Sequence, residues 1–216
     1  MVLMNFAGSA CSRTNVDPKS VPEPAHVGPS ASDTGTQTAV FAGGCFWCVE
    51  GVFEHLDGVN AVVSGYAGGS AGTAHYESVS SGSTDHAEVV QISYDPQRIS
   101  YGKLLKVFFT VAHDPTQLDR QGPDTGRQYR SAIFFQSGDE KQAAQTYIRQ
   151  LEEAKVFDQP IVTKLEPLGT FYPAEDYHQD FVQHNPNHPY VRMHALPKVK
   201  KVRQGFADQL RATTNE

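Results

Sequence analysis

The chain has 216 residues, a formal net charge of −6 and 39% hydrophobic residues. That size fits one soluble globular domain plus a tail, with enough residues to bury a substantial core. The acidic balance argues against a protein that binds nucleic-acid phosphates, and without an apolar run of roughly 18 residues we expect no membrane span.

Residues 1–37 are predicted to form a disordered leader outside the core. Residues 12–37 are rich in Ser, Pro, Thr, Gly and Asp and show no hydrophobic period. Ahead of them, residues 8–11 (GSAC) resemble a bacterial lipoprotein processing site, but the preceding apolar stretch is short and lacks Lys and Arg. Two interpretations stay open. Cys11 marks such a site and places the protein in the cell envelope or periplasm, or it is incidental and the protein is in the bacterial cytoplasm.

From residue 38 onward, hydrophobic periodicity predicts alternating strands and helices. We expect strands over residues 38–42, 59–66, 88–94, 129–136 and 161–166, and helices over 45–56, 100–111, 138–154 and 199–211. The order β-α-β, then β-α-β, predicts an α+β fold. It is a two-layer α/β sandwich with a split βαβ (ferredoxin-like) core, a mostly antiparallel sheet and a C-terminal extension.

One catalytic domain is therefore expected over residues 38–216. Three predicted loops, 66–87, 113–128 and 167–190, are long for a compact domain and hold most of the unusual polar residues. Long ordered loops are usually functional, so we expect part of the site there.

Two of the three cysteines, Cys45 and Cys48, enclose the only tryptophan of the chain. Cys45 follows a strand and a glycine turn and is expected in the first helical turn, where the positive helix end favours a thiolate nucleophile. Cys48 shares its helix face, at a separation that suits a disulfide if the first turn loosens. It either resolves a sulfenic acid on Cys45 or packs in the core.

Five motifs follow one another in order between residues 39 and 190. They are Gly44-Cys45-Phe46-Trp47 with Glu50, His86-Ala87-Glu88, His113-Asp114-Pro115, QYRS at 128–131 and AEDYHQ at 174–179. Together they resemble the type A family of peptide methionine sulfoxide reductases. The resemblance implies a peptide-methionine (S)-S-oxide reductase, which reduces the S epimer of methionine sulfoxide, free or in proteins. It also implies recycling by thioredoxin or another dithiol, and no metal or organic cofactor. We expect a monomer.

Under this resemblance, the Cys45 thiolate attacks the sulfoxide sulfur and becomes a sulfenic acid. The sulfoxide oxygen then needs hydrogen donors. A partly buried Glu88 would keep its proton and donate it, and Tyr76 and Tyr129 offer phenolic hydroxyls.

The remaining predicted site residues shape the cavity. The resemblance implies that Asp124 helps to orient the site, although by composition it lies in a turn, and making that turn is a sufficient role. Phe46 and Trp47 are predicted to form an apolar slot for the S-methyl group, with core packing as the alternative. His178 is predicted to close the site or to hydrogen-bond within it, or else to be structural.

The recycling route stays open because no cysteine lies beyond Cys48, whereas many family members carry recycling cysteines near the C-terminus. The choices are a Cys45–Cys48 disulfide, an external thiol, or Cys11, whose long flexible arm dilutes its effective concentration. Two other classes compete. One is a general dithiol oxidoreductase with a C-x-x-C motif, and the other is a zinc module in which His178 and His184 join the two cysteines.

Overall fold

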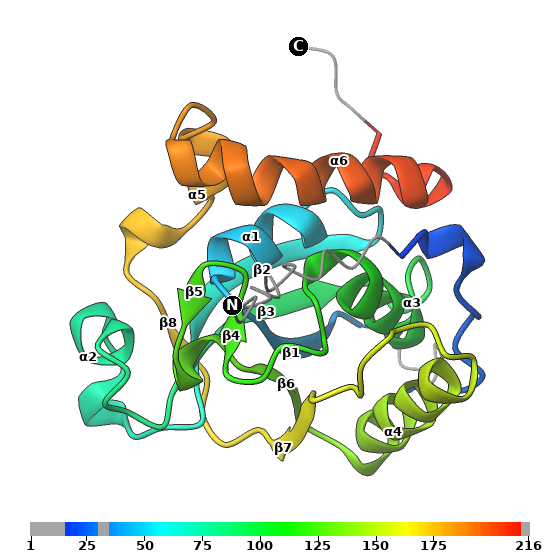
Figure 1. Cartoon of the computed structure of the whole chain (residues 1–216), viewed down its shortest axis with the longest axis horizontal. Helices are drawn as coiled ribbons and strands as arrows, with labels where there is room; N and C mark the ends of the chain where they lie inside the picture. Colours follow the sequence, from blue (N-terminus) through cyan, green and yellow to red (C-terminus); the bar gives the residue numbers. More distant parts are fainter. Residues whose placement is uncertain (1–15, 30–34, 213–216) are drawn as a thin grey trace, which may run out of the picture.

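A central six-stranded sheet organises the chain in a computed structural model that describes residues 16–29 and 35–212 (Figure 1). The strand order is β7-β6-β1-β3-β2-β8, and every neighbouring pair except β6–β7 is antiparallel. The strands are β1 (Gln37–Gly43), β2 (Val59–Ala67), β3 (Ala87–Tyr94), β6 (Ser131–Phe135), β7 (Lys164–Pro167) and β8 (Tyr172–Pro173), with β4 (Arg120–Gln121) and β5 (Asp124–Thr125) in a separate hairpin.

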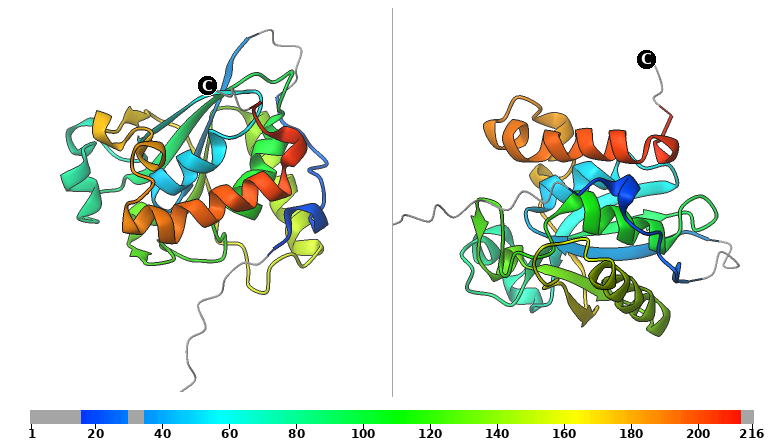
Figure 2. Two further views of the ribbon diagram at one scale, coloured as in Figure 1. Left: turned by 90° about the horizontal axis from the view of Figure 1, so that it is seen from above. Right: turned by 45° about the vertical axis from the view of Figure 1, so that its right-hand side comes forward.

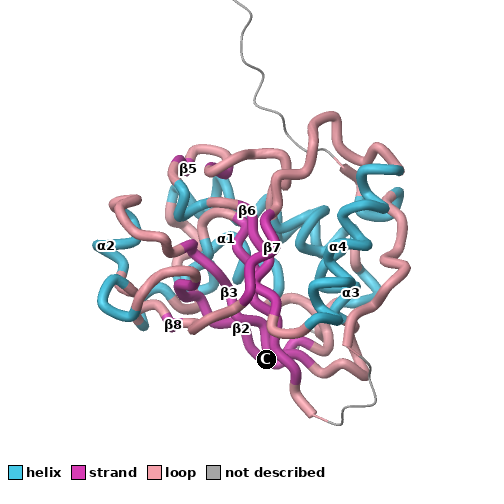
Figure 3. The backbone as a smooth tube through the Cα atoms, turned by 90° about the horizontal axis from the view of Figure 1, so that it is seen from below, coloured by secondary structure: helices cyan, strands magenta, loops and turns pink. Residues whose placement is uncertain are grey.

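The main helices cover one face of the sheet, with α3 and α4 side by side (Figure 3). Outside this layer, α6 lies along α1 (Figure 2). The helices are α1 (Phe46–Phe53), α2 (Tyr76–Ser80), α3 (Tyr101–Val107), α4 (Gly138–Glu153), α5 (Phe181–His184) and α6 (Leu196–Gly205), with π-helical turns at Phe108–Ala112 and Val191–Ala195. None of them, within the described part of the chain, is long and apolar enough to cross a membrane.

Alternation along β1 divides the apolar side chains between the two faces of the sheet. Phe41 points toward the helices, where its ring lies 4.9 Å from that of Phe108 and 5.9 Å from that of Phe53. Val40 belongs to a smaller cluster on the opposite face, covered by Leu168 and Phe171 of the segment after β7. In the part of the chain that the structure describes, the main helices therefore lie on one side of the sheet, as in a two-layer sandwich.

The predicted split βαβ core is confirmed. In β1-α1-β2 and β3-α3-β6 the partner strands are not adjacent, and β1 and β3 pair in the middle of the sheet. All nine predicted elements are present with shifted ends, and Ser100 caps α3 by accepting the Lys103 N–H at 3.1 Å. The short elements α2, α5, β8 and the β4–β5 hairpin were missed, because two to five residues carry no measurable period.

The predicted disordered leader is wrong for residues 16–29. Val21 is buried in the main core, and its carbonyl accepts from the ammonium of Lys106 at 2.9 Å, which also bonds Glu23 at 2.7 Å. The Pro22 carbonyl accepts from the Tyr147 hydroxyl at 3.1 Å. Individual contacts with α3 and α4 hold this segment in place. Because such contacts do not recur at a regular spacing, hydrophobic periodicity could not predict them. Cys11 and the rest of residues 1–15 lie outside the described residues.

An ion pair at the sheet edge joins Arg130, the residue before β6, to Glu166 of β7, and its loss is expected to destabilise the fold. The guanidinium of Arg130 is 5% exposed and binds both carboxylate oxygens of Glu166, at 3.1 and 3.2 Å. Glu166→Gln leaves that charge unpaired, so we expect a loss of about 2 kcal/mol in urea unfolding. The control is Glu153→Gln, at an exposed carboxylate on α4, which should change the free energy of unfolding by less than about 0.5 kcal/mol. Equal effects of the two substitutions would contradict the expectation.

Candidate active site

Cys45 lies at the corner between β1 and α1, and a glycine makes that corner feasible. Gly44 has φ +89°, and a Cβ there would lie 2.5 Å from the Cβ of Gln121. Cys45 is the N-cap residue of α1 and does not lie in its first turn. Its sulfur accepts no capping hydrogen bond. The Phe46 N–H donates instead to Oε2 of Glu88 at 3.0 Å.

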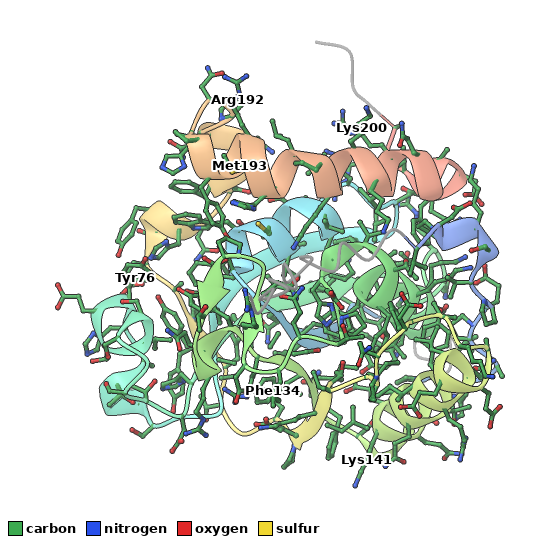
Figure 4. All side chains as sticks on the ribbon, in the orientation of Figure 1. Tyr76, Phe134, Lys141, Arg192, Met193 and Lys200 are labelled. Carbon is green, nitrogen blue, oxygen red and sulfur yellow. The ribbon has the colours of Figure 1, made fainter. Side chains whose placement is uncertain are left out.

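A cavity of about 190 Å³ opens beside the Cys45 sulfur. Seven of the nine predicted site residues line it, and they come from α1, α2, β3, β5 and the turn before β6. Figure 4 shows Tyr76 rising from α2 at one side of the molecule. The lining residues are Cys45, Phe46, Trp47, Tyr76, Glu88, Asp124, Tyr129 and Tyr190.

Three groups in this cavity keep their protons at neutral pH. Glu88 is 2% exposed, and burial raises the pKa of its carboxyl to about 8. Burial also raises the pKa of the Tyr76 and Tyr129 hydroxyls above their usual range. The cavity therefore presents the carboxylic acid of Glu88 and the phenols of Tyr76 and Tyr129 as hydrogen donors.

Trp47 forms a fixed aromatic wall of the cavity. Its ring stacks on Phe181 of α5, with centroids 3.7 Å apart and planes 7° from parallel. Its indole N–H donates to Nδ1 of His178 at 3.1 Å. His178 is 1% exposed and does not line the cavity. Its position is therefore behind the wall, where it holds Trp47.

Glu175 was missed by the sequence reasoning, although it lies in one of the five motifs. Its two carboxylate oxygens accept from the Tyr76 N–H at 2.9 Å and from the Tyr66 hydroxyl at 2.8 Å. These bonds fasten the start of α2 to β2 and so hold Tyr76 at the cavity. The two bonds connect residues about 100 positions apart, so no local pattern signals them.

Tyr190 was also missed, because nothing in its local sequence marks it. Its hydroxyl donates to Oδ2 of Asp124 at 2.5 Å and lies 3.9 Å from the Cys48 sulfur. Asp124 is in β5, directly after the Gly122-Pro123 turn of the β4–β5 hairpin, as its turn-like composition predicted.

Cys48 faces a second cavity, of about 280 Å³, which Cys45 also lines. A hydrogen bond from Cys45, assisted by the nearby charge of Lys198, lowers the pKa of Cys48 to about 7. Burial raises the pKa of Cys45 well above its usual range. Burial therefore opposes the thiolate expected on Cys45, and the helix N–H that would stabilise it donates to Glu88.

The described residues contain no cluster of ligands that fits the zinc-binding alternative. Within residues 16–29 and 35–212, no group of three or more His, Cys, Asp or Glu side chains is arranged to hold a metal ion. The Nδ1 of His178 is engaged by Trp47.

Known proteins resemble this chain over nearly all of its described length. A sequence model described as "Peptide methionine sulfoxide reductase" matches residues 37–210. Peptide methionine sulfoxide reductase MsrA 2 of Synechocystis is 57% identical over 90% of this chain and 92% of its own. MsrA of Deinococcus radiodurans is 50% identical over 81% of this chain and 84% of its own.

Solved structures share the fold. Reduced Mxr1 from Saccharomyces cerevisiae is 34% identical, with a TM-score of 0.67 over 75% of this chain and 92% of that one. Methionine sulfoxide reductase A of Corynebacterium diphtheriae is also 34% identical, with a TM-score of 0.61 over 77% of this chain and 84% of that one.

Glu88→Gln is expected to weaken the pH dependence of folding stability. The carboxyl pKa is about 8 in the folded protein, against an ordinary value of 4.5. The folded state thus holds a proton that the unfolded chain releases between these values. Its contribution is fully present below about pH 4.5 and is lost as the pH rises through about 8. In urea unfolding between about pH 5 and pH 9, the free energy of unfolding should therefore fall less steeply in the variant.

Glu153→Gln, at an exposed carboxylate, should keep the wild-type slope. Burial also raises the pKa of Glu50 and Glu54, so these groups add the same slope to every protein compared. Parallel curves for wild type and Glu88→Gln would show that Glu88 is already ionised in the folded state.

Proposed function

The chain belongs to the peptide methionine sulfoxide reductase family, and we propose that Cys45 is the thiol that attacks the substrate. The protein is an oxidoreductase that reduces methionine sulfoxide by thiol chemistry. One observation carries the assignment to Cys45. Of the two described cysteines, only Cys45 lines the cavity that also holds the protonated Glu88 and the two phenols.

The lining of the cavity suggests how the substrate binds. The S-methyl group packs on Phe46 and Trp47, since sulfur and methyl groups pack well on aromatic rings. The sulfoxide oxygen points to Glu88 and the two phenols. Because methyl, oxygen and side chain then occupy three different places around sulfur, only one epimer can present its sulfur to Cys45. We assign the S epimer, free or within a protein.

The first step is proposed as follows. The Cys45 sulfur attacks the sulfoxide sulfur, and the proton it held passes to Cys48 along their hydrogen bond. Glu88 gives its proton to the sulfoxide oxygen. The hydroxyl then moves to the Cys45 sulfur with the electron pair of the S–O bond, and the S–S bond formed in the attack breaks with its pair on the methionine sulfur. Methionine leaves reduced, and Cys45 is oxidised to the sulfenic acid, Cys45–S–OH. Asp124 orients the cavity through Tyr190, while His178 positions Trp47.

We further propose that Cys48 resolves the sulfenic acid as a Cys45–Cys48 disulfide, which thioredoxin or another dithiol then reduces. Both cysteines are free and buried in this structure, three positions apart at the start of α1. No organic cofactor is needed, because the thiols supply both electrons. We expect a monomer with one catalytic domain, to which residues 16–29 contribute through their packing on α3 and α4.

Two cysteine substitutions separate the two halves of the reaction. Cys45→Ser should abolish methionine formation from S-sulfoxide, because no other described thiol reaches the cavity. Cys48→Ser should form about one methionine per enzyme and then stop when thioredoxin is the only reductant. Methionine is quantified in single-turnover and steady-state assays. An active Cys45→Ser would overturn the assignment of the nucleophile. Normal recycling of Cys48→Ser would instead favour an external thiol.

Methionine formation should also depend on the proton of Glu88. Its pKa of about 8 means that single-turnover rates fall as the pH rises through that value. Glu88→Gln should be slower by roughly a hundredfold at neutral pH and should lose this pH dependence. A variant that keeps the wild-type pH profile would assign the profile to another group.

A further inference from the structure

Two cavities meet at the cysteine pair. The groups proposed to reduce the substrate line one cavity, and Cys48 lines the other. Glu88, Asp124 and the phenols lie on the side where the substrate oxygen is proposed to bind. Cys48 opens only to the other cavity, beside Lys198. Apart from Cys45, Tyr190 is the only described residue that lines both.

If the proposed function holds, this division matters in the resolving step, in which Cys48 attacks the sulfenic acid of Cys45. A proton must then pass from the side of Cys48 to the side of the substrate cavity. After methionine has left, the hydroxyl of Cys45–S–OH needs a proton to depart as water. The spare proton is then on Cys48, which lies on the other side. The two cysteines are buried, at 8% and 2% exposure, so a side chain that lines both cavities offers the direct route for this proton.

We propose that Tyr190 is a catalytic residue of the resolving step and carries the Cys48 proton to Asp124. Its hydroxyl lies 3.9 Å from the Cys48 sulfur and donates to Oδ2 of Asp124 at 2.5 Å. One oxygen thus lies between the thiol that must lose a proton and the carboxyl to which it already donates, so it is placed to pass a proton from one to the other. The inference rests on the proposed function, because it requires Cys48 to attack Cys45.

The step balances without an added oxidant. The S–S bond forms between Cys48 and Cys45, and the S–O bond of the sulfenic acid breaks with its electron pair on oxygen. The Cys48 proton moves to the Tyr190 oxygen while the Tyr190 proton moves to Asp124. Asp124, which lines the substrate cavity, returns a proton to the leaving hydroxyl, and water departs. The Cys48 sulfur is oxidised and the Cys45 sulfur is reduced.

The surroundings of Tyr190 hold its ring in place for this role. Its ring meets Trp47 edge-on, with centroids 5.9 Å apart and planes at 78°, and lies 4.8 Å from the ring of His194. The titratable groups that face the hydroxyl are the two cysteines from the start of α1 and Asp124 from β5. Burial raises the pKa of Tyr190, so the phenol is neutral when it receives the thiol proton.

Tyr190→Phe tests the relay, with Tyr129→Phe as the matched control. Both substitutions remove one phenolic oxygen from the substrate cavity, but only Tyr190 reaches Cys48. Reduced enzyme is mixed with excess methionine S-sulfoxide without reductant. Methionine formed and thiols remaining are followed separately between about pH 6 and pH 9. In Tyr190→Phe, thiol loss should be slower than methionine formation by roughly a hundredfold at neutral pH. The sulfenic acid on Cys45 should therefore accumulate, and dimedone should trap it.

Two further readouts distinguish a relay from a packing effect. In Tyr190→Phe the deficit should shrink as the pH rises, because hydroxide replaces the relay. In Tyr129→Phe methionine formation should slow while thiol loss keeps pace with it. Equal slowing of both steps in Tyr190→Phe, or a deficit that is independent of pH, would overturn the inference. Failure of the proposed function would look different, because the wild type would then form no methionine or lose no thiols.

Discussion

The hydrogen bond from the Phe46 N–H to Glu88 is the contact on which the rest of the site depends. It joins the first residue of α1 to the second residue of β3, at 3.0 Å. A charged carboxylate would usually be the better acceptor for a free helix N–H. Here burial is strong enough to keep Glu88 protonated despite that bond. This contact therefore holds Cys45 beside Glu88, whose protonated carboxyl serves as a hydrogen donor in the cavity.

Burial also explains why the cysteine pair differs from a thiolate at a helix end. Cys45 loses the helix N–H to Glu88 and lies in surroundings with little water, so its proton is retained. Cys48 gains the hydrogen bond from Cys45 and the charge of Lys198, which itself bonds the Ala112 carbonyl at 2.7 Å. Burial therefore acts against a thiolate on Cys45, whereas these contacts favour a thiolate on Cys48.

The segment from residue 174 to 195, which follows β8, supports the site from outside the sheet. Glu175 holds α2, His178 and Phe181 fix Trp47, and Tyr190 connects Asp124 with Cys48. None of these contacts follows a helical or strand period. From the sequence, residues 167–190 are predicted to be a long loop that holds functional side chains, and His178 is the one residue of this segment with a predicted site role. Long-range contacts of this kind can be found only after the chain has folded.

The sequence by itself determined the order of the main strands and helices, because periodicities of 2 and 3.6 residues are local properties. It also determined which residue types could form the site, since the motifs around Cys45, Glu88 and Asp124 are short stretches of adjacent residues. Only the tertiary structure decided the protonation states, the division into two cavities and the place of Tyr190. These depend on burial and on contacts between residues as far apart as Asp124 and Tyr190, and neither is encoded within any short window of sequence.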